Sequence, residues 1–558
     1  MRPDEFPDPA LEPRQREFHP RLLELGLVAL LTLAVTVALQ FAAGAHGAEF
    51  GDDEASHYVS GLLVHDYLLH GVPRSPIAYL KQFHSHYPLV GIGHWPPLYY
   101  GVEAVWMLLF SASRSSMLLL SAVVTAATAT LSYGFVARRL GRLAGLFAAL
   151  AFVVVPIVQK SSSELMLDVP VALTSLLAMI VYVRYLETES AWSAVLFALL
   201  AVTAMMVKGN GACLALLPPF AVLIGRRFDL LLKPSFWLPL PIVGVLTGPW
   251  YWLTYGQAEA GFRYHWGWDY LATATTENGA ILLTTLGPVV LIAAAIGAVA
   301  MILAPYRRTS GSWLVGTLAL FAAIWTFQSL VPAAIQDRYL AQALPPLLML
   351  ALWGAWVCGD LVAGRIASGS QPHRLAGALS VLVLAVALAP QALHLWTKPH
   401  RGYREAAQAA WAARRDDNPA VLIVADGLGE ASTVAELAMA DPHRPSLFAV
   451  RGSRLLGGGG YNREDYVPRF ETPEQVMAAI DEYSIPLVLF HADRGRKPWT
   501  HVAQIAAARR LYPQRWQLIS GDEQSPDSVL LFRIRGNDAK PADTVKLSAL
   551  SAPKALAQ

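Results

Sequence analysis

The chain has 558 residues, of which 54% are hydrophobic and 15% are charged. An average soluble domain carries about 25% charged residues, so this composition, with a mean hydropathy of +0.40, predicts a membrane protein with many spanning helices. The formal net charge of +2 gives no support for nucleic acid as a partner. The two cysteines, Cys213 and Cys358, lie in apolar segments, which argues against a disulfide framework or a cysteine metal site.

The chain begins with a polar segment, residues 1–20, followed by an apolar run at 22–43. Because Arg14, Arg16 and Arg21 precede the run, we expect a cytoplasmic tail and then a first helix that crosses the bilayer. A cleaved signal peptide is the alternative, but the run is longer than the usual core of about 7–15 residues.

An acidic cluster, Asp52, Asp53 and Glu54, follows the first apolar run and opens a loop at 44–113 that is rich in His, Tyr and Pro. Irregular backbone of that length must lie outside the hydrocarbon or be buried by protein. We expect two amphipathic pieces of this loop, near 58–69 and 97–110, to lie along the membrane interface. The second is expected to be a re-entrant or surface helix.

Arginines in the connecting loops predict which loops are cytoplasmic. These loops contain Arg138–Arg139, Arg226–Arg227, Arg307–Arg308 and residues 365–374. Between them, apolar segments predict helices at 115–137, 142–158, 169–186, 191–207, 211–225, 235–254, 279–304, 313–332, 339–357 and 376–396. With the first helix this makes about eleven crossings. The first loop and residues 159–168, 208–211, 256–278 and 336–339 then share the exterior face.

That shared face collects groups suited to one kind of chemistry. Asp52, Asp53 and Glu54 come from the first loop, while Glu164 and Asp168 come from the second, and Lys208 and Arg338 supply cations. A carboxylate can accept a proton from an attacking hydroxyl or amine, and fixed cations can stabilise a departing phosphate. The combination predicts glycosyl transfer from a lipid-linked sugar phosphate.

Simpler interpretations exist for each group. Acids past a helix end can be solvated flank, Asp168 before Pro170 can be a helix cap, and Lys208 can extend to the interface. His84 and His86 could ligate a divalent metal, but no cysteine accompanies them, so neither a metal site nor a cofactor is assigned. A transporter or flippase of lipid-linked glycans is the alternative function, for which internal repeats and midplane polar groups are typical.

The order of several short motifs resembles the GT-C superfamily of glycosyltransferases. Within it the sequence is similar to the dolichyl-phosphate-mannose-protein mannosyltransferase family, which includes the bacterial 4-amino-4-deoxy-L-arabinose lipid A transferases. The resemblance covers about residues 20–360. It rests on Asp53–Glu54 with Tyr58, His94–Trp95–Pro96–Pro97–Leu98–Tyr99–Tyr100, Arg138–Arg139–Leu140–Gly141, Leu167–Asp168–Val169–Pro170, Lys208–Gly209–Asn210 and Arg338–Tyr339–Leu340.

The resemblance implies roles for individual residues. Asp53 maps to the first-loop base or acceptor-positioning acid and Asp168 to the second-loop acid, with Asp52 and Glu54 as further candidates for catalysis. His94, Pro96, Pro97, Tyr99, Lys208, Arg338 and Tyr339 map to the donor-binding side. Trp95 stands where the arabinose transferases carry a lysine, so the sugar stays open, and the extra Asp52 leaves two candidate bases. The implied partners are a polyprenyl-phosphate sugar, a lipid, glycan or protein acceptor of the cell envelope, and the bilayer of the inner membrane.

From about residue 398 the composition becomes that of a soluble domain. Short apolar runs at 421–424, 446–450, 486–490 and 529–532 predict buried strands, and helical patterns lie between them. We therefore expect a small α/β domain at 398–540 on the exterior, periplasmic side, after a transmembrane catalytic domain at 21–397. Residues 541–558, rich in Ala, Pro, Ser and Lys, predict a disordered tail.

Overall fold

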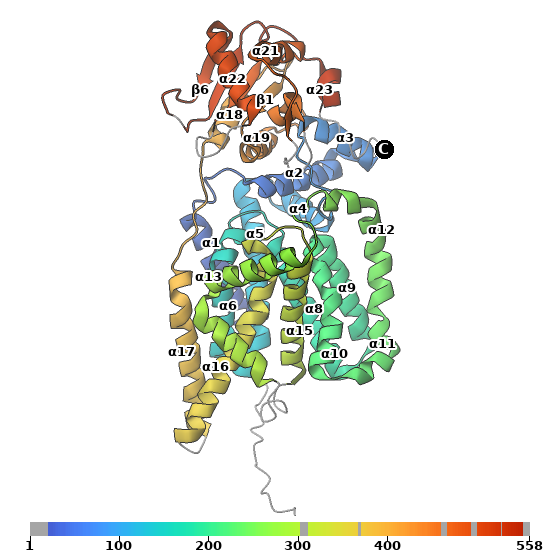
Figure 1. The fold of residues 1–558 in the computed structure, drawn as a ribbon, viewed down its shortest axis with the longest axis vertical. Coiled ribbons are helices and arrows are strands. Elements are labelled where there is room, and N and C mark those ends of the chain that lie inside the picture. Colours follow the sequence, from blue (N-terminus) through green and yellow to red (C-terminus); the bar gives the residue numbers. More distant parts are fainter. Residues whose placement is uncertain are drawn as a thin grey trace, which may run out of the picture.

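The computed structural model describes residues 21–301, 311–366, 370–458, 466–492, 499–525 and 527–550. Long helices form a bundle at one end of the molecule and a sheet with its helices lies at the other, with α2 and α3 between them (Figure 1). The predicted cytoplasmic tail, 1–20, and the loop with Arg307 and Arg308 lie outside the described residues.

Seven helices of the described chain are long and apolar enough to cross a membrane, or eight if one bent pair counts as a span. The chain is therefore a polytopic helical membrane protein. The seven are α1 (Leu22–Ala42), α5 (Arg114–Leu140), α8 (Asp168–Thr188), α13 (Trp268–Ala300), α15 (Gly311–Leu330), α16 (Leu344–Ile366) with the preceding turn η4 (Asp337–Ala343), and α17 (Ser370–Ala392); the bent pair is α6 (Arg142–Val154) and α7 (Pro156–Ser162). The remaining bundle elements are α9 (Ala191–Val207), η2 (Gly209–Leu216), α10 (Leu217–Gly225), η3 (Phe228–Leu232), α11 (Pro234–Trp237) and α12 (Pro239–Glu259).

Proline and glycine interrupt two of these helices. α6 and α7 meet at an angle of 62°, because Pro156 has no N–H to continue the hydrogen bonding of α6. The single helix predicted at 142–158 is therefore two helices, and the second extends to Ser162. α13 is broken at Gly287, which has a φ of +76°, outside the helical range, and is followed by Pro288.

The first loop is more helical than its sequence predicted. It contains α2 (Asp52–Asp66), the short π-helix η1 (Tyr67–Gly71), α3 (Pro76–His86) and α4 (Leu98–Leu109). The acidic cluster forms the first turn of α2, where carboxylates interact favourably with the free N–H groups of a helix start. α4 has 12 residues and so spans about 18 Å, too short to cross a hydrocarbon core of about 30 Å, as expected for a surface or re-entrant helix.

The C-terminal region is built on a five-stranded mixed sheet in the order β2-β1-β5-β7-β6. β1 pairs in parallel with β2 and β5, while β7 is antiparallel to β5 and β6. Four strands coincide with the predicted apolar runs. β6 was not predicted; it is an edge strand whose central residues Leu518 and Ile519 are exposed. The elements are α18 (Tyr403–Ala413), β1 (Ala420–Val424), α19 (Gly427–Ala440), β2 (Phe448–Arg451), α20 (Gly452–Leu455), β3 (Gly457–Gly458), β4 (Val467–Pro468), α21 (Pro473–Glu482), β5 (Leu487–Phe490), α22 (Thr500–Leu511), η5 (Pro513–Arg515), β6 (Trp516–Ser520), β7 (Leu530–Ile534) and α23 (Thr544–Leu550).

The predicted disordered tail at 541–558 is wrong for its first part. Residues 544–550 form α23, and the side chain of Leu547 is fully buried in the core of the sheet region. Burial of one leucine on a short helix supplies the apolar contact that composition alone did not reveal. Residues 551–558 lie outside the described chain.

Polar contacts join the sheet region to the first loop and to the start of α5. Buried Arg114 forms an ion pair with Glu436 of α19, and Arg444 pairs with Asp66 of α2 at 2.8 Å. The hydroxyl of Tyr87 donates to Asp441 at 2.5 Å. These contacts hold the first loop and the start of α5 against the sheet region, with α2 between the bundle and the sheet region (Figure 1).

Candidate active site

The three acids of the predicted cluster face different surroundings because consecutive helix residues point about 100° apart. Asp52 is exposed, Asp53 is partly buried and Glu54 is buried. Asp53 forms an ion pair with Arg338 of η4. Within this one turn of α2, Asp52 thus faces solvent, Asp53 faces the bundle and Glu54 faces the protein interior.

Both carboxylate oxygens of Glu54 accept hydrogen bonds from other parts of the protein. Its carboxylate accepts from Lys398 at 2.6 and 2.8 Å, from the peptide N–H of Gly51 at 2.7 Å and from that of Leu165 at 3.2 Å. Lys398 is also buried. These bonds tie the start of α2 to the second loop and to the segment that follows α17, so Glu54 differs from Asp53 in having its oxygens committed to structure.

A second ion pair joins the two bundle residues Asp168 and Lys208. The Lys208 ammonium donates to Oδ1 of Asp168 at 2.5 Å, and both side chains are buried. Oδ2 of Asp168 has no hydrogen-bond partner. Asp168 makes no side-chain cap bond at the start of α8, so the capping interpretation is wrong.

The aromatic ring of Tyr339 connects the two ion pairs. The Lys208 ammonium lies 4.5 Å from the ring centroid and the Arg338 guanidinium lies 5.5 Å from it. Cations at these distances are attracted to the ring face. The side chains of Asp53, Arg338, Tyr339, Lys208 and Asp168 therefore form one continuous group, which brings together the acids predicted from two separate loops.

A third pair, Lys160 with Asp337, borders the same group but is much looser. The Lys160 ammonium lies 3.2 and 3.4 Å from the two Asp337 oxygens, and the side chains are 33% and 43% exposed, against 7% and 1% for Lys208 and Asp168. Exposed pairs stabilise a fold by about 0–1 kcal/mol, whereas removing one partner of a buried pair costs about 3–5 kcal/mol. Lys160 is therefore the cation of the three that can change partner at least cost.

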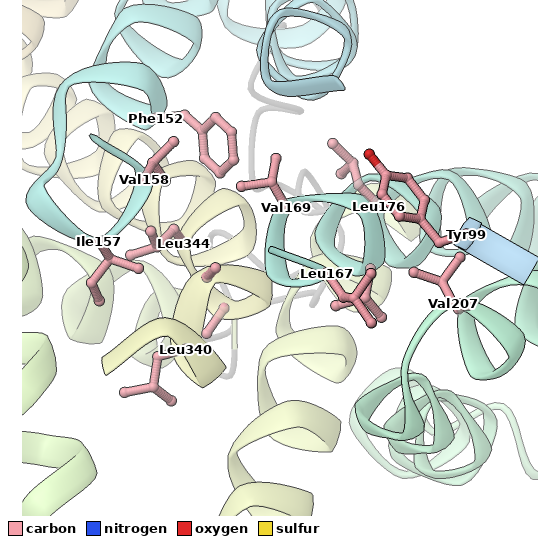
Figure 2. Packing of buried hydrophobic residues seen from close by; sticks show 14 of the residues in the cluster. Tyr99, Phe152, Ile157, Val158, Leu167, Val169, Leu176, Val207, Leu340 and Leu344 are labelled. Atoms are coloured by element: carbon pink, nitrogen blue, oxygen red, sulfur yellow. The ribbon is translucent and has the colours of Figure 1, made fainter. Parts of the chain in front are cut away.

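Apolar neighbours in the sequence hold these charged residues in place. Leu167 and Val169 flank Asp168, Val207 precedes Lys208, and Leu340 follows Tyr339, and all four belong to one buried hydrophobic cluster (Figure 2). Interiors pack as densely as organic crystals, so such anchors allow little displacement. The core beneath the site thus fixes the spacing of its charges.

Charge and burial set the protonation of groups on α2. Burial favours the neutral form of Asp53, but the charge of Arg338 and its hydrogen bond to Asp53 outweigh it, so the pKa of Asp53 lies below its usual value. Burial lowers the pKa of His57 to about 3, although Asp53 opposes this shift. Nδ1 of His57 lies 2.9 Å from the Tyr100 hydroxyl. At neutral pH the site therefore combines an ionised Asp53 with a neutral His57.

Glu164, in the turn before α8, has a different character. Burial and, secondly, the nearby Glu54 carboxylate raise the pKa of Glu164 to about 7. Lys398, Lys160 and Arg338 reduce this shift. This acid therefore titrates close to neutral pH beside a site whose other acids are paired.

The predicted donor-binding residues of the first loop are placed unequally. Nδ1 of His94 lies 3.1 Å from the carbonyl oxygen of Gln257, which links the loop to α12. Pro96 is buried and Pro97 immediately precedes α4. Tyr99 is 6% exposed and lies in the apolar cluster beside Leu176 (Figure 2), so its side chain contributes to packing and not to the charged group.

The two histidines considered for a metal lie on α3. The ring of His86 stacks on Phe448 with centroids 4.0 Å apart, and its Nδ1 lies 2.9 Å from the carbonyl oxygen of Gln82. Within the described chain no group of three or more His, Cys, Asp or Glu residues is arranged to hold a metal ion. His86 therefore serves the contact between α3 and the sheet.

Sequence reasoning missed three residues that the structure brings to this region: Lys160, Lys398 and His57. Lys160 follows the helix-breaking Pro156 by four residues, a spacing that places it on the turn leading away from α6. His57 lies four residues after Asp53 and so on the same face of α2. No local signal pointed to Lys398, because its partner Glu54 is 344 residues away.

Comparison with known proteins supports the fold and the family resemblance. The family model described as dolichyl-phosphate-mannose-protein mannosyltransferase matches residues 94–253, and no curated protein matches over the chain. The crystal structure of ArnT from Cupriavidus metallidurans bound to undecaprenyl phosphate is similar with a TM-score of 0.55 and 14% identity, covering 92% of this chain and 99% of that one. Its apo state gives 0.54 and 15%, with the same coverage of both chains.

A third similar structure is the archaeal oligosaccharyltransferase AglB from Archaeoglobus fulgidus, in complex with an inhibitory peptide and a dolichol-phosphate. Its TM-score is 0.50 at 12% identity, covering 94% of this chain and 77% of that one. At such identities the likeness concerns the fold. The chain thus has the GT-C glycosyltransferase fold, and its residues 94–253 match the dolichyl-phosphate-mannose-protein mannosyltransferase family, as the sequence motifs predicted.

Proposed function

We propose that this protein is an inverting glycosyltransferase that moves a sugar from a polyprenyl-phosphate donor to a lipid, glycan or protein acceptor of the cell envelope. The observation that carries the proposal is the meeting of Asp53–Arg338 and Asp168–Lys208 around the ring of Tyr339. Structures of similar fold hold undecaprenyl phosphate or dolichol-phosphate, which supports a donor of that class.

In the proposed reaction Asp53 accepts the proton of the acceptor's hydroxyl or amine. Its lowered pKa keeps it ionised at neutral pH, as a base must be. The acceptor attacks the anomeric carbon, and the bond from that carbon to the phosphate oxygen breaks with its electron pair passing to the phosphate. Arg338 and Lys208 stabilise the charge that develops there, and Asp168 holds Lys208 in position. Asp52, exposed beside Asp53, is the alternative base.

We further propose that the site faces the cell exterior, with about eleven crossings and an inner-membrane location. The bent pair α6–α7 and the shorter apolar helices α9 and η2–α10, together with α12, would complete the count beyond the seven long spans. The sheet region would then cover the site from the periplasmic side. The proposed reaction uses protein cations in the role a metal would otherwise fill, so no cofactor is assigned.

A transporter or flippase is the competing function, and the bent pair α6–α7 is a feature that transporters share. Transporters use broken helices to place polar groups near the bilayer midplane. Here the break delivers Lys160 to Asp337, the neighbour of Arg338, and so to the same charged group as Asp53. This placement favours a site for transfer at one membrane face.

The test uses membranes that contain the protein, defined undecaprenyl-phosphate sugars, and mass spectrometry of lipids, glycans and proteins. Sugar transfer with inversion at the anomeric carbon is expected for the native chain. Asp53→Asn and Asp168→Asn should each lower it at least about 100-fold, measured per molecule of protein that elutes as the native chain does. Transfer that survives both substitutions, or a product of retained configuration, would refute the proposal.

A further inference from the structure

We infer that Lys160 is a phosphate-binding residue that leaves Asp337 and binds the isoprenoid phosphate as the glycosyl bond breaks. This inference rests on the proposed function and assigns a further residue to its site. The three ion pairs of the site differ in how far their side chains are buried. Lys208 and Arg338 are mostly buried, whereas the Lys160–Asp337 pair is long and partly exposed on both sides.

Contact lengths indicate how easily each cation can change partner. Charge-assisted N–H···O bonds are typically about 2.7–2.9 Å long, and Lys208 and Asp168 meet at 2.5 Å. The Lys160 ammonium lies 3.2 Å or more from either oxygen of Asp337. A long contact open to solvent is readily replaced by a contact to an incoming phosphate oxygen.

Asp337 keeps a partner when Lys160 departs. Its Oδ1 accepts a hydrogen bond from the peptide N–H of Arg338 at 2.7 Å. Release of Lys160 therefore does not leave a carboxylate without a donor, which would be costly. The same bond holds Asp337 beside Arg338, so a phosphate that contacts the Arg338 guanidinium lies near Lys160.

The charge balance of the reaction explains why a third cation is useful. The donor phosphate is a diester with one negative charge, and breaking the glycosyl bond leaves a monoester with about −1.5 to −2 charge near neutral pH. In the paired state each cation of the group already has an acid: Asp53, Asp168 or Asp337. A cation that transfers to the phosphate as its charge grows stabilises the transition state more than the bound donor.

The two members of the pair predict opposite effects, which gives a sharp test with purified protein in nanodiscs. For Lys160→Met we expect turnover to fall about 10- to 100-fold with a smaller change in KM for the donor, and weaker binding of undecaprenyl phosphate. For Asp337→Asn, which frees Lys160 and keeps an oxygen for the Arg338 N–H, undecaprenyl phosphate should bind more tightly and inhibit more strongly. Lys160→Arg should restore most of the turnover.

A matched control lies at the opposite end of the bundle. Lys233, which precedes α11, pairs with Glu189, and their side chains are 35% and 33% exposed; α11 lies at the end of the bundle far from the sheet region (Figure 1). Lys233→Met and Glu189→Gln should leave turnover and undecaprenyl phosphate binding within about twofold of native, because loss of an exposed pair has small effects.

Several outcomes would overturn the inference. They are native binding of undecaprenyl phosphate by Lys160→Met, weaker binding by Asp337→Asn, or competition by inorganic phosphate or phosphatidylglycerol as strong as that by undecaprenyl phosphate. Binding that depends on Lys160 in a protein that transfers no sugar would instead sink the proposed function and leave the phosphate site standing. If the native protein transfers sugar and Lys160→Met has the same kinetics, the proposed function stands and the phosphate site at Lys160 is refuted.

Discussion

The charged group around Tyr339 and the contact that α2 and the start of α5 make with residues 398–440 are both rich in ion pairs, yet they are built differently. At the contact, Glu54 and Lys398 are both buried, as are Arg114 and Glu436. In the charged group, the side chain of Asp53 is 33% exposed, and those of the neighbouring Lys160 and Asp337 are 33% and 43% exposed. Closed pairs hold segments together, and partly open pairs leave atoms that a substrate can reach.

The comparison predicts its largest effect at Asp53. Asp53→Asn removes the charge that accepts the proton and should lower transfer about 10²- to 10⁴-fold, with little loss of folded protein because Asp53 is partly exposed. Transfer assays on membranes measure this, and Asp52→Asn serves as the control on an exposed neighbour. If Asp52→Asn causes the greater loss, Asp52 is the base.

Lys208→Met should affect both activity and stability. The substitution leaves the buried Asp168 without its cation, which costs about 3–5 kcal/mol, and removes a donor to the phosphate, which costs about 10²-fold in turnover. Thermal unfolding in detergent and turnover measured on the folded fraction separate the two. Asp168→Asn combined with Lys208→Met should recover stability without turnover; recovered turnover would contradict a role in phosphate binding.

Lys398→Met tests the closed pairs, and here stability should change more than chemistry. Buried Glu54 would lose its cation, at a cost of about 3–5 kcal/mol, while the turnover of the protein that remains folded should fall by less than about tenfold. Glu54→Gln together with Lys398→Met should be more stable than Lys398→Met alone. A large loss of turnover per folded molecule in this double variant would show that Glu54 has a chemical role.

The smallest effect is expected from Glu164 and depends on pH. Since its folded pKa is raised to about 7, the folded state binds more protons than the unfolded state between about pH 4.3 and 7. Stability should therefore fall as pH rises through this range, by about 1–3 kcal/mol. Glu164→Gln should flatten the dependence in thermal unfolding series, and an unchanged slope would contradict the assignment.

Sequence reasoning located the long apolar helices and the acids, because apolar runs and acids at helix ends are local signals. It placed Asp53, Asp168, Lys208 and Arg338 on one face, and the structure joins them. It could not separate Asp53 from Glu54, since their difference lies in Arg338 and Lys398, which are distant in sequence. Tyr99 was assigned to the donor-binding side by the family resemblance of its motif, and the structure buries its side chain in the apolar core.

In the extramembrane parts, sequence reasoning missed one local signal and two features that depend on distant residues. Gly51 and Glu54 have the spacing of a helix start, in which the acid reaches back to the preceding N–H, and this could have extended α2 to Asp52. The edge strand β6 has exposed apolar residues on its central positions, and α23 depends on the burial of Leu547 against distant residues. Neither feature can be read from a short window of sequence.

The segment between the last span and the sheet region is hydrogen-bonded to the N-terminal part of the chain. The peptide N–H of Lys398 donates to the carbonyl oxygen of Ala43, at the exit of α1, at 2.8 Å, while its side chain binds Glu54. Because these bonds lie only a few residues past α17, the connection between α17 and the sheet region is restrained and cannot act as a free hinge. Any movement of that region must therefore carry with it the start of α2, where Asp53 lies.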